Sequence, residues 1–222
     1  MIVAERKSLD EILAMLQGCS RVLVVGCGTC VTVCMAGGEK EVGVLASLLR
    51  LAAQREGRTV EIGEATIERQ CEWEFVDELA PAIRRYDAVL SMGCGAGVQT
   101  IAQRFGGVRV LPALNTKFIG IPEKQGMWVE MCLGCGDCVL DRTGGICPIA
   151  RCSKGLLNGP CGGSQGGKCE VSKDTDCAWQ LIYDRLASLG RLDLLETEFA
   201  PKDWSKNRDG GPRKVLREEV ML

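Results

Sequence analysis

The amino-terminal half of the chain alternates between short apolar runs and segments whose apolar residues recur at helical spacing. The run at residues 22–25 is unbroken by polar residues, which is typical of a strand buried on both faces. Together with it, the segments at residues 59–63, 87–93 and 108–112 predict four strands. The intervening segments predict three helices, at residues 8–17, 39–56 and 75–86. This alternation predicts an α/β fold with a small doubly wound parallel sheet of the flavodoxin or Rossmann-like kind.

Two of the predicted helices have further support. Ser8 and Glu11 have the spacing of a capping box, which starts a helix by satisfying its first N–H groups. The helix over residues 39–56 places Val42, Leu45, Leu49 and Ala52 on one face, which is expected to lie against the sheet.

The pattern changes after residue 113. Residues 114–131 read as a connector, and the stretch from 131 to 177 is rich in glycine and shows no apolar period. Such a stretch cannot bury enough apolar surface to offset the entropy of ordering it, so a cross-link is needed. It holds eight of the chain's 14 cysteines, which are Cys132, Cys135, Cys138, Cys147, Cys152, Cys161, Cys169 and Cys177.

Metal ligation is the cross-link that the spacing favours. Disulfides are not expected, because the amino terminus lacks the apolar run of a secretory signal peptide. Cys132, Cys135 and Cys138 form CxxCxxC, as in the ligands of ferredoxin clusters, and a Cys-Pro pair follows at Cys147. The three are expected to share one cluster, with Cys147 or a more distant cysteine as the fourth ligand. Eight cysteines suit two four-thiolate clusters, and structural zinc is the alternative.

Five further cysteines follow the predicted strands. They are Cys27, Cys30, Cys34, Cys71 and Cys94. The carboxyl ends of parallel strands share one edge of the sheet, where binding sites form, so a third metal site is expected there, with either Cys34 or Cys71 as the spare. Cys19 precedes the first of these strands and is expected to fill the core. A dithiol redox pair at Cys27 and Cys30 is a weaker reading of the same residues.

Composition narrows the function. The chain has no histidine, which excludes Ser-His-Asp and Cys-His catalysis and mixed cysteine-histidine zinc sites. Its 27 Lys and Arg against 29 Asp and Glu give a net charge of -2, which does not suggest nucleic-acid binding. No segment reaches the roughly 18 apolar residues of a membrane span. We expect a cytoplasmic protein.

The carboxyl-terminal part predicts one helix and an extension. Residues 177–189 have a helical apolar stripe of Trp179, Ile182, Tyr183 and Leu186, capped by Thr175 or Asp176. From residue 197 the periodicity is lost and basic residues gather around Trp204, which suits a partner-binding tail. The predicted domains are residues 1–113, an α/β domain with one cluster site; 114–190, a cysteine-rich domain with two clusters; and 191–222, the tail.

Several long motifs resemble the MetV-type iron-sulfur subunit of methylenetetrahydrofolate reductases. They are CGTCVTVCMAGGEKEV, RQCEWEF, GCGAGVQT, CxxCxxC followed by TGGICPIARCSKGLLNGPCGG, CAWQLIYDRL and PKDWSK. The cysteine-rich part is also similar to the carboxyl-terminal domain fused to some of these reductases.

This resemblance implies a subunit that transfers electrons and does not itself perform hydride chemistry. Its expected cofactors are two to three 4Fe-4S clusters, with zinc possible at one site. Its expected partner is a catalytic subunit that holds FAD or FMN and reduces methylenetetrahydrofolate in one-carbon metabolism, as in the Wood-Ljungdahl pathway. The electron donor would be ferredoxin, a pyridine-nucleotide module or a heterodisulfide-reductase-type complex. The competing hypotheses are a structural zinc scaffold without a redox role, and a thiol oxidoreductase using Cys27 and Cys30.

Overall fold

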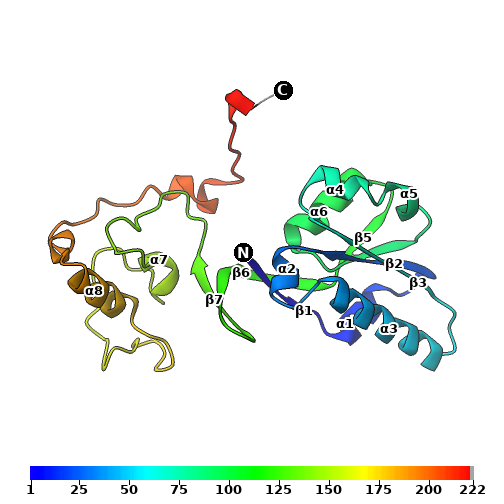
Figure 1. Ribbon diagram of the computed structural model, residues 1–222, viewed down its shortest axis with the longest axis horizontal. Coiled ribbons are helices and arrows are strands. Elements are labelled where there is room, and N and C mark those ends of the chain that lie inside the picture. Colours follow the sequence, from blue (N-terminus) through cyan, green and yellow to red (C-terminus); the bar gives the residue numbers. More distant parts are fainter. Residues whose placement is uncertain (221–222) are drawn as a thin grey trace. The chain divides into compact units, whose positions relative to one another are not determined.

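A computed structural model describes residues 1–220 of the chain. It divides into two compact units, one formed by Met1–Val129 and the other beginning at Glu130. Figure 1 shows strands and helices in the first unit, and mostly loops in the second. Each unit is described by itself below.

The first unit is built around a four-stranded parallel sheet. Its strands are β2 (Arg21–Cys27), β3 (Glu61–Ile67), β4 (Ala88–Ser91) and β5 (Arg109–Pro112). They are arranged in the order β3-β2-β4-β5, with each neighbouring pair parallel. The direction of the strand order reverses between β2 and β4, and in open α/β sheets ligands bind outside the carboxyl ends of the strands at such a point. The α/β fold with a parallel sheet that the sequence predicts is confirmed.

Helices cover both faces of this sheet (Figure 1). On one face, α1 (Leu9–Met15) and α3 (Glu39–Arg55) pack on Val22 and Val24. On the other face, Leu23 and Val25 meet α4 (Trp73–Asp77), α5 (Ala80–Ile83) and α6 (Gly95–Arg104). Alternate residues of β2 therefore belong to two different cores, which explains why its sequence is apolar without interruption.

The local signals for helices were read correctly at several positions. The Ser8 hydroxyl accepts the Glu11 N–H at 3.2 Å, as the capping box predicts. The buried face of α3 holds Val42, Leu45 and Leu49, but Ala53 takes the position that was predicted for Ala52.

Three elements differ from their predictions. The segment 75–86, predicted as one helix, is interrupted between α4 and α5. Pro81 lies in the first turn of α5, where a helix tolerates the missing N–H of proline. The strand predicted at 59–63 begins and ends later, at Glu61–Ile67. Helix α6 was not predicted, because its first turn is Gly95-Ala96-Gly97, which carries no apolar period.

Two strands of a second, three-stranded sheet come from the segment that the sequence predicts to be a connector. Strand β6 (Leu114–Lys124) pairs antiparallel with β1 (Ile2–Arg6), and β7 (Met127–Cys132) completes the order β1-β6-β7. The connector prediction for residues 114–131 was wrong. Most side chains of β6 are exposed, so the strand shows neither a continuous apolar run nor a clean alternation. Gly126, with a φ of 80°, lies in the tight turn between β6 and β7.

The second unit has one substantial helix, α8 (Ala178–Ser188), and a short α7 (Pro148–Arg151). Its tail forms four short 3-10 turns, η1 (Leu192–Leu195), η2 (Trp204–Lys206), η3 (Arg208–Gly210) and η4 (Glu218–Val220). Trp179, Ile182 and Leu186 of α8 are its buried apolar cluster. The predicted helix is confirmed, although Cys177 itself is the N-cap and Tyr183 is half exposed.

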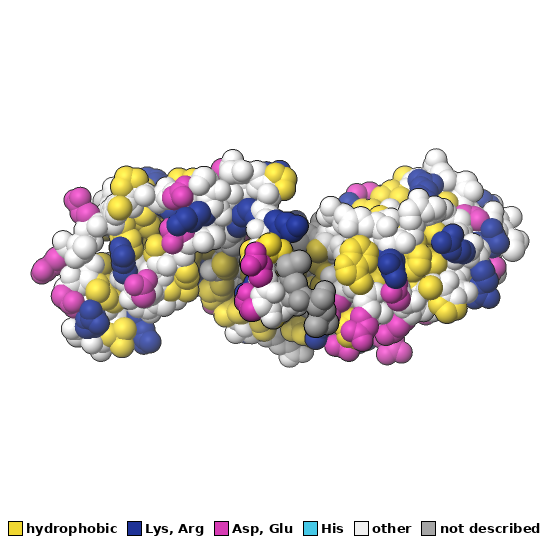
Figure 2. Space-filling model, turned by 90° about the horizontal axis from the view of Figure 1, so that it is seen from above, with side chains coloured by type: hydrophobic (Ala, Val, Ile, Leu, Met, Phe, Trp, Pro, Cys, Tyr) yellow, Lys and Arg dark blue, Asp and Glu magenta, His cyan; other side chains and the backbone are white. Residues whose placement is uncertain are grey.

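Two further features concern the charged surface and the helices. On the face seen in Figure 2, Lys and Arg side chains are interspersed with Asp and Glu side chains. Across residues 1–220, none of the helices has the length and apolar character that crossing a membrane requires.

Candidate metal centres

Four cysteines follow the carboxyl ends of three neighbouring strands in the parallel sheet. Cys27 is the last residue of β2, and Cys30 begins the short helix α2 (Cys30–Val33) that follows it. Cys71 comes after β3, and Cys94 is the N-cap of α6, directly after β4. The topology that the sequence predicts thus places all four at the edge where the strand order reverses.

The Cys71 thiol is influenced by two of the other thiols. Burial raises the pKa of Cys71, and the charges of Cys94 and Cys27 raise it further. Like charges disfavour one another's ionised form only at short range, so a cation that binds here would relieve the repulsion. Cys27 Sγ lies 3.5 Å from the Thr29 hydroxyl and 3.8 Å from the carbonyl oxygen of Glu68.

A buried glutamine lies behind this edge. Gln70 is only 1 % exposed, and its amide donates to the carbonyl oxygens of Val25 and Gly26 at 2.8 and 3.0 Å. The Ser91 hydroxyl donates to the Gln70 carbonyl oxygen at 2.5 Å and accepts the Gly93 N–H at 3.1 Å. One side chain therefore joins the end of β2 to the loop after β4, and so fixes the positions from which Cys27, Cys71 and Cys94 project.

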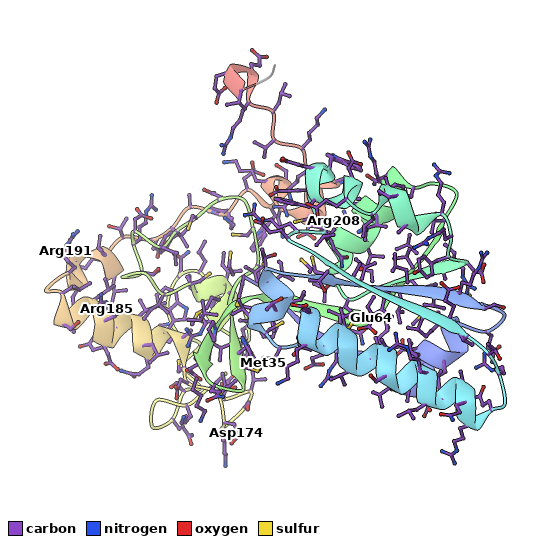
Figure 3. All side chains as sticks on the ribbon, turned by 45° about the vertical axis from the view of Figure 1, so that its right-hand side comes forward. Met35, Glu64, Asp174, Arg185, Arg191 and Arg208 are labelled. Atoms are coloured by element: carbon purple, nitrogen blue, oxygen red, sulfur yellow. The ribbon has the colours of Figure 1, made fainter. Side chains whose placement is uncertain are left out.

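Cys34 lies at the end of α2, one helical turn after Cys30, and is as buried as Cys27. It is 6 % exposed, within the core on the α3 side, and its thiol lies 3.7 Å from the carbonyl oxygen of Ala4 in β1 and 3.6 Å from that of Val31. The turn that ends α2 produces this orientation: Met35, labelled in Figure 3, has a φ of 55° and is half exposed while Cys34 points inward. Cys19 is likewise buried, as expected for a core residue.

In the second unit, three cysteine sulfurs accept backbone N–H groups. Gly134 N–H points at Cys132 Sγ over 3.3 Å, Ala150 N–H at Cys147 Sγ over 3.4 Å, and Gly163 N–H at Cys161 Sγ over 3.4 Å. Each donor lies two or three residues after its cysteine. Hydrogen bonds of this kind stabilise a metal-bound thiolate and tune the potential of a cluster. Gly134 has a φ of 59°, a conformation that favours glycine at the turn of the CxxCxxC motif.

Four cysteines, Cys161 among them, surround one small pocket of the second unit. Its walls include Cys152, Cys161, Cys169 and Cys177, with Pro160 and Trp179 beside them. The Ser153 hydroxyl, 3.4 Å from Cys169 Sγ, lowers the pKa of that thiol. Cys177 is the N-cap of α8, where the helix dipole favours an anionic sulfur.

The donor set of the second unit fits iron-sulfur ligation. Its thiols, four of them around one pocket and three in CxxCxxC, are the ligands that iron-sulfur clusters use, and N–H donors are directed at three of its cysteine sulfurs. Among residues 1–220, no three or more Cys, Asp or Glu side chains converge closely enough for a single metal ion. The assignment of each cysteine to a cluster therefore stays a prediction.

Comparison with protein families gives a match over part of the chain. Residues 111–205, which begin in the first unit and end in the second, match the family described as methylene-tetrahydrofolate reductase C terminal. The resemblance that the sequence predicts to this family is confirmed for these residues. Comparisons with curated proteins and with solved structures gave no match.

The matched range includes more than the cysteine-rich loops. It begins in β5, takes in β6 and β7, holds all eight cysteines from Cys132 to Cys177, and reaches Trp204 in η2. The edge cysteines from Cys27 to Cys94 lie outside it.

Two polar residues that lie near the predicted ligands, Gln70 and Lys202, were not identified from the sequence. Gln70 stands directly before Cys71, and an amide beside a candidate ligand is not by itself informative. Lys202 belongs to the PKDWSK motif, whose recurrence supports the resemblance but does not say what the lysine contacts. Only the tertiary structure assigns them partners.

Proposed function

We propose that this chain is the iron-sulfur electron-transfer subunit of a methylenetetrahydrofolate reductase. It would pass electrons from an upstream donor to the flavin, FAD or FMN, of a separate catalytic subunit, which reduces methylenetetrahydrofolate to methyltetrahydrofolate. The observation that carries the proposal is the grouping of Cys152, Cys161, Cys169 and Cys177 around one pocket within the residues that match this family.

The cysteines divide into sets that support this role. Cys132, Cys135, Cys138 and Cys147 would hold one cluster and the four pocket cysteines a second. Cys27, Cys30, Cys71 and Cys94 would hold a third group at the edge of the parallel sheet, which leaves Cys34 as the spare. When bound, such clusters supply one-electron transfer at potentials set by their surroundings.

Backbone groups around the cysteines would stabilise bound clusters. The N–H groups of Gly134, Ala150 and Gly163 compensate negative charge on the sulfurs that they meet. The loops around the ligands are glycine-rich, which lets backbone donors approach a sulfur without interference from side chains. With no histidine in the chain, proton transfer to the folate is assigned to the catalytic partner.

The first test is elemental analysis of protein purified without oxygen. We expect about eight to twelve irons and matching sulfide per chain, as two or three four-iron clusters require. Zinc at two or three per chain with little iron would instead establish the structural scaffold. Cys161→Ser should lose about four irons per chain, whereas Cys19→Ala, which changes a core cysteine, should keep the full content.

The second test concerns the direction of electron flow. The chemically reduced subunit should bleach the flavin absorbance of a methylenetetrahydrofolate reductase catalytic subunit. This chain alone should not reduce methylenetetrahydrofolate. Folate reduction without the flavin subunit would contradict the proposal. A dithiol mechanism would require Cys30→Ser to abolish transfer while leaving the iron content unchanged.

A further inference from the structure

The tail of the second unit folds back onto the loop that carries CxxCxxC. We call residues 202–213 the latch and residues 132–138 the cluster loop. Arg208, labelled in Figure 3, lies in η3 within the latch. Three contacts join the latch to the cluster loop, and each involves a different part of both segments.

The first contact is a buried lysine. The Lys202 side chain is only 2 % exposed, its ammonium donates to the carbonyl oxygen of Asp137, and it lies 3.6 Å from the Asp137 carboxylate. The ring of Trp204 is 5.9 Å from the ammonium, measured to its centroid. The same Asp137 carbonyl oxygen lies 3.6 Å from Cys135 Sγ. The ammonium and the thiol therefore share one oxygen atom, which places a fixed positive charge beside a predicted ligand.

The second and third contacts involve the glycines of the cluster loop. Gly136 has a φ of 85°, and a β-carbon there would collide with the carbonyl oxygen of Lys206. The Arg213 guanidinium donates to the carbonyl oxygen of Gly134, and it lies 3.5 Å from that of Lys206. Gly134 is also the residue whose N–H points at Cys132 Sγ. A second cation is thus attached to the turn that directs an N–H at a sulfur.

Charge balance explains why a lysine is buried here. Removing an ammonium from water is unfavourable unless compensating charge and hydrogen bonds are close by. The Asp137 carboxylate is 45 % exposed, so water screens much of its attraction for Lys202. A cluster bound by Cys132, Cys135 and Cys138 would carry net negative charge close to both cations of the latch.

We propose that the latch supplies Lys202 and Arg213 as charge-compensating residues for the cluster held by Cys132, Cys135 and Cys138. Their positive charge favours the reduced, more negative form of that cluster, so it raises its reduction potential, and the latch covers the loop that holds it. This inference rests on the proposed function, since it presupposes a cluster at these cysteines. The tail is then part of a redox site within its own unit.

The test compares two variants of the latch with a matched control. Lys202→Met and Arg213→Met remove one positive charge each and keep an unbranched chain of similar length. Lys214→Met removes the same charge from the neighbouring exposed lysine. Redox titration followed by electron paramagnetic resonance should show one cluster signal moved to a more negative midpoint in Lys202→Met and Arg213→Met, and no movement in Lys214→Met.

If a variant does not retain its cluster, iron content distinguishes a role of Lys202 through its charge from a role through packing. If Lys202→Met loses about four irons per chain and Lys202→Arg retains them, the charge is required and the inference holds. If both variants lose the iron, packing and not charge is the role of Lys202, and the inference is wrong. Equal midpoints in Lys202→Met and Lys214→Met, with full iron in both, would also overturn it. An iron-free wild-type chain would instead refute the proposed function.

Discussion

At the residue scale, the edge of the parallel sheet depends on a polar side chain with no direct part in ligation. Gln70 satisfies two carbonyl groups of β2 and accepts the Ser91 hydroxyl in a place that is almost closed to water. Gly93 and Gly97 accommodate it, because a β-carbon at either position would collide with its side chain. A buried polar group that loses its partner costs about 1–3 kcal/mol, more than the roughly 1 kcal/mol that an average hydrogen bond contributes.

Gln70→Ala should therefore lower the free energy of unfolding by about 1–3 kcal/mol, since the Gly26 carbonyl and the Ser91 hydroxyl lose a buried partner, whereas the Val25 carbonyl keeps the Met92 N–H. Urea denaturation followed by circular dichroism measures the change. Gln103→Ala, on the exposed side of α6, serves as the control and should unfold like the wild type. Equal midpoints for the two variants would show that the Gln70 hydrogen bonds are replaced by water.

At the element scale, the pairing of β2 with β4 is reinforced by one carboxylate where both strands begin. Asp87 accepts the backbone N–H groups of Ser20 and Arg21, both at 2.9 Å, and pairs with the Arg21 guanidinium at 2.9 Å. The Ser20 N–H, the Arg21 side chain and the Arg21 N–H together hold the pKa of Asp87 below its ordinary value of 3.8. All three contacts favour the ionised carboxylate.

The pH dependence of stability follows from this direction. A carboxyl group whose pKa is lower in the folded chain stabilises the fold above its unfolded pKa, and this contribution is lost as the pH falls through the folded value. Asp87→Asn should therefore unfold at lower urea than the wild type at pH 6, and the difference should shrink as the pH falls below 3.8. Asp141→Asn, which changes an exposed carboxylate, is the control. A difference that stays constant with pH would argue against a role for the charge.

At the scale of the whole molecule, the two units depend on different sources of stability. The first unit has two apolar cores, one on each face of its sheet, whereas the buried apolar cluster of the second consists of three residues of α8. A unit with so small a core needs cross-links, and metal binding at the proposed sites would contribute folding free energy to it.

Removal of the metal should thus affect the units unequally. In the chelator-treated full chain, we expect amide hydrogens of residues 131–177 to exchange at rates near those of unfolded peptides, while β2 and β4 keep their protection. Hydrogen-deuterium exchange with mass spectrometry measures both regions in one sample. Unchanged protection of residues 131–177 after complete iron removal would mean that the loops are held by their own contacts.

The sequence by itself determined the parallel sheet and the positions of its cysteines. The continuous apolar run at residues 22–25 specifies a strand covered on both faces. The alternation of strands and helices specifies parallel strands whose carboxyl ends meet at one edge, so Cys27, Cys71 and Cys94 could be placed there without coordinates. Cysteine spacing likewise pointed to the family that residues 111–205 match, because ligand spacing is a local property of the chain.

Only the tertiary structure decided the features that depend on contacts between distant residues. The pairing of β1 with β6 escaped detection because half-exposed strands carry little apolar pattern. Whether Cys34 faces inward depends on its packing against Ala4, which lies 30 residues away. The contact of Lys202 with Asp137 spans 65 residues, and a charged residue in a tail carries no mark of burial in its sequence. Apolar periodicity in the sequence indicates which face of a helix or strand is buried. Which element packs on that face depends on contacts between residues far apart in the chain, and these are visible only in the tertiary structure.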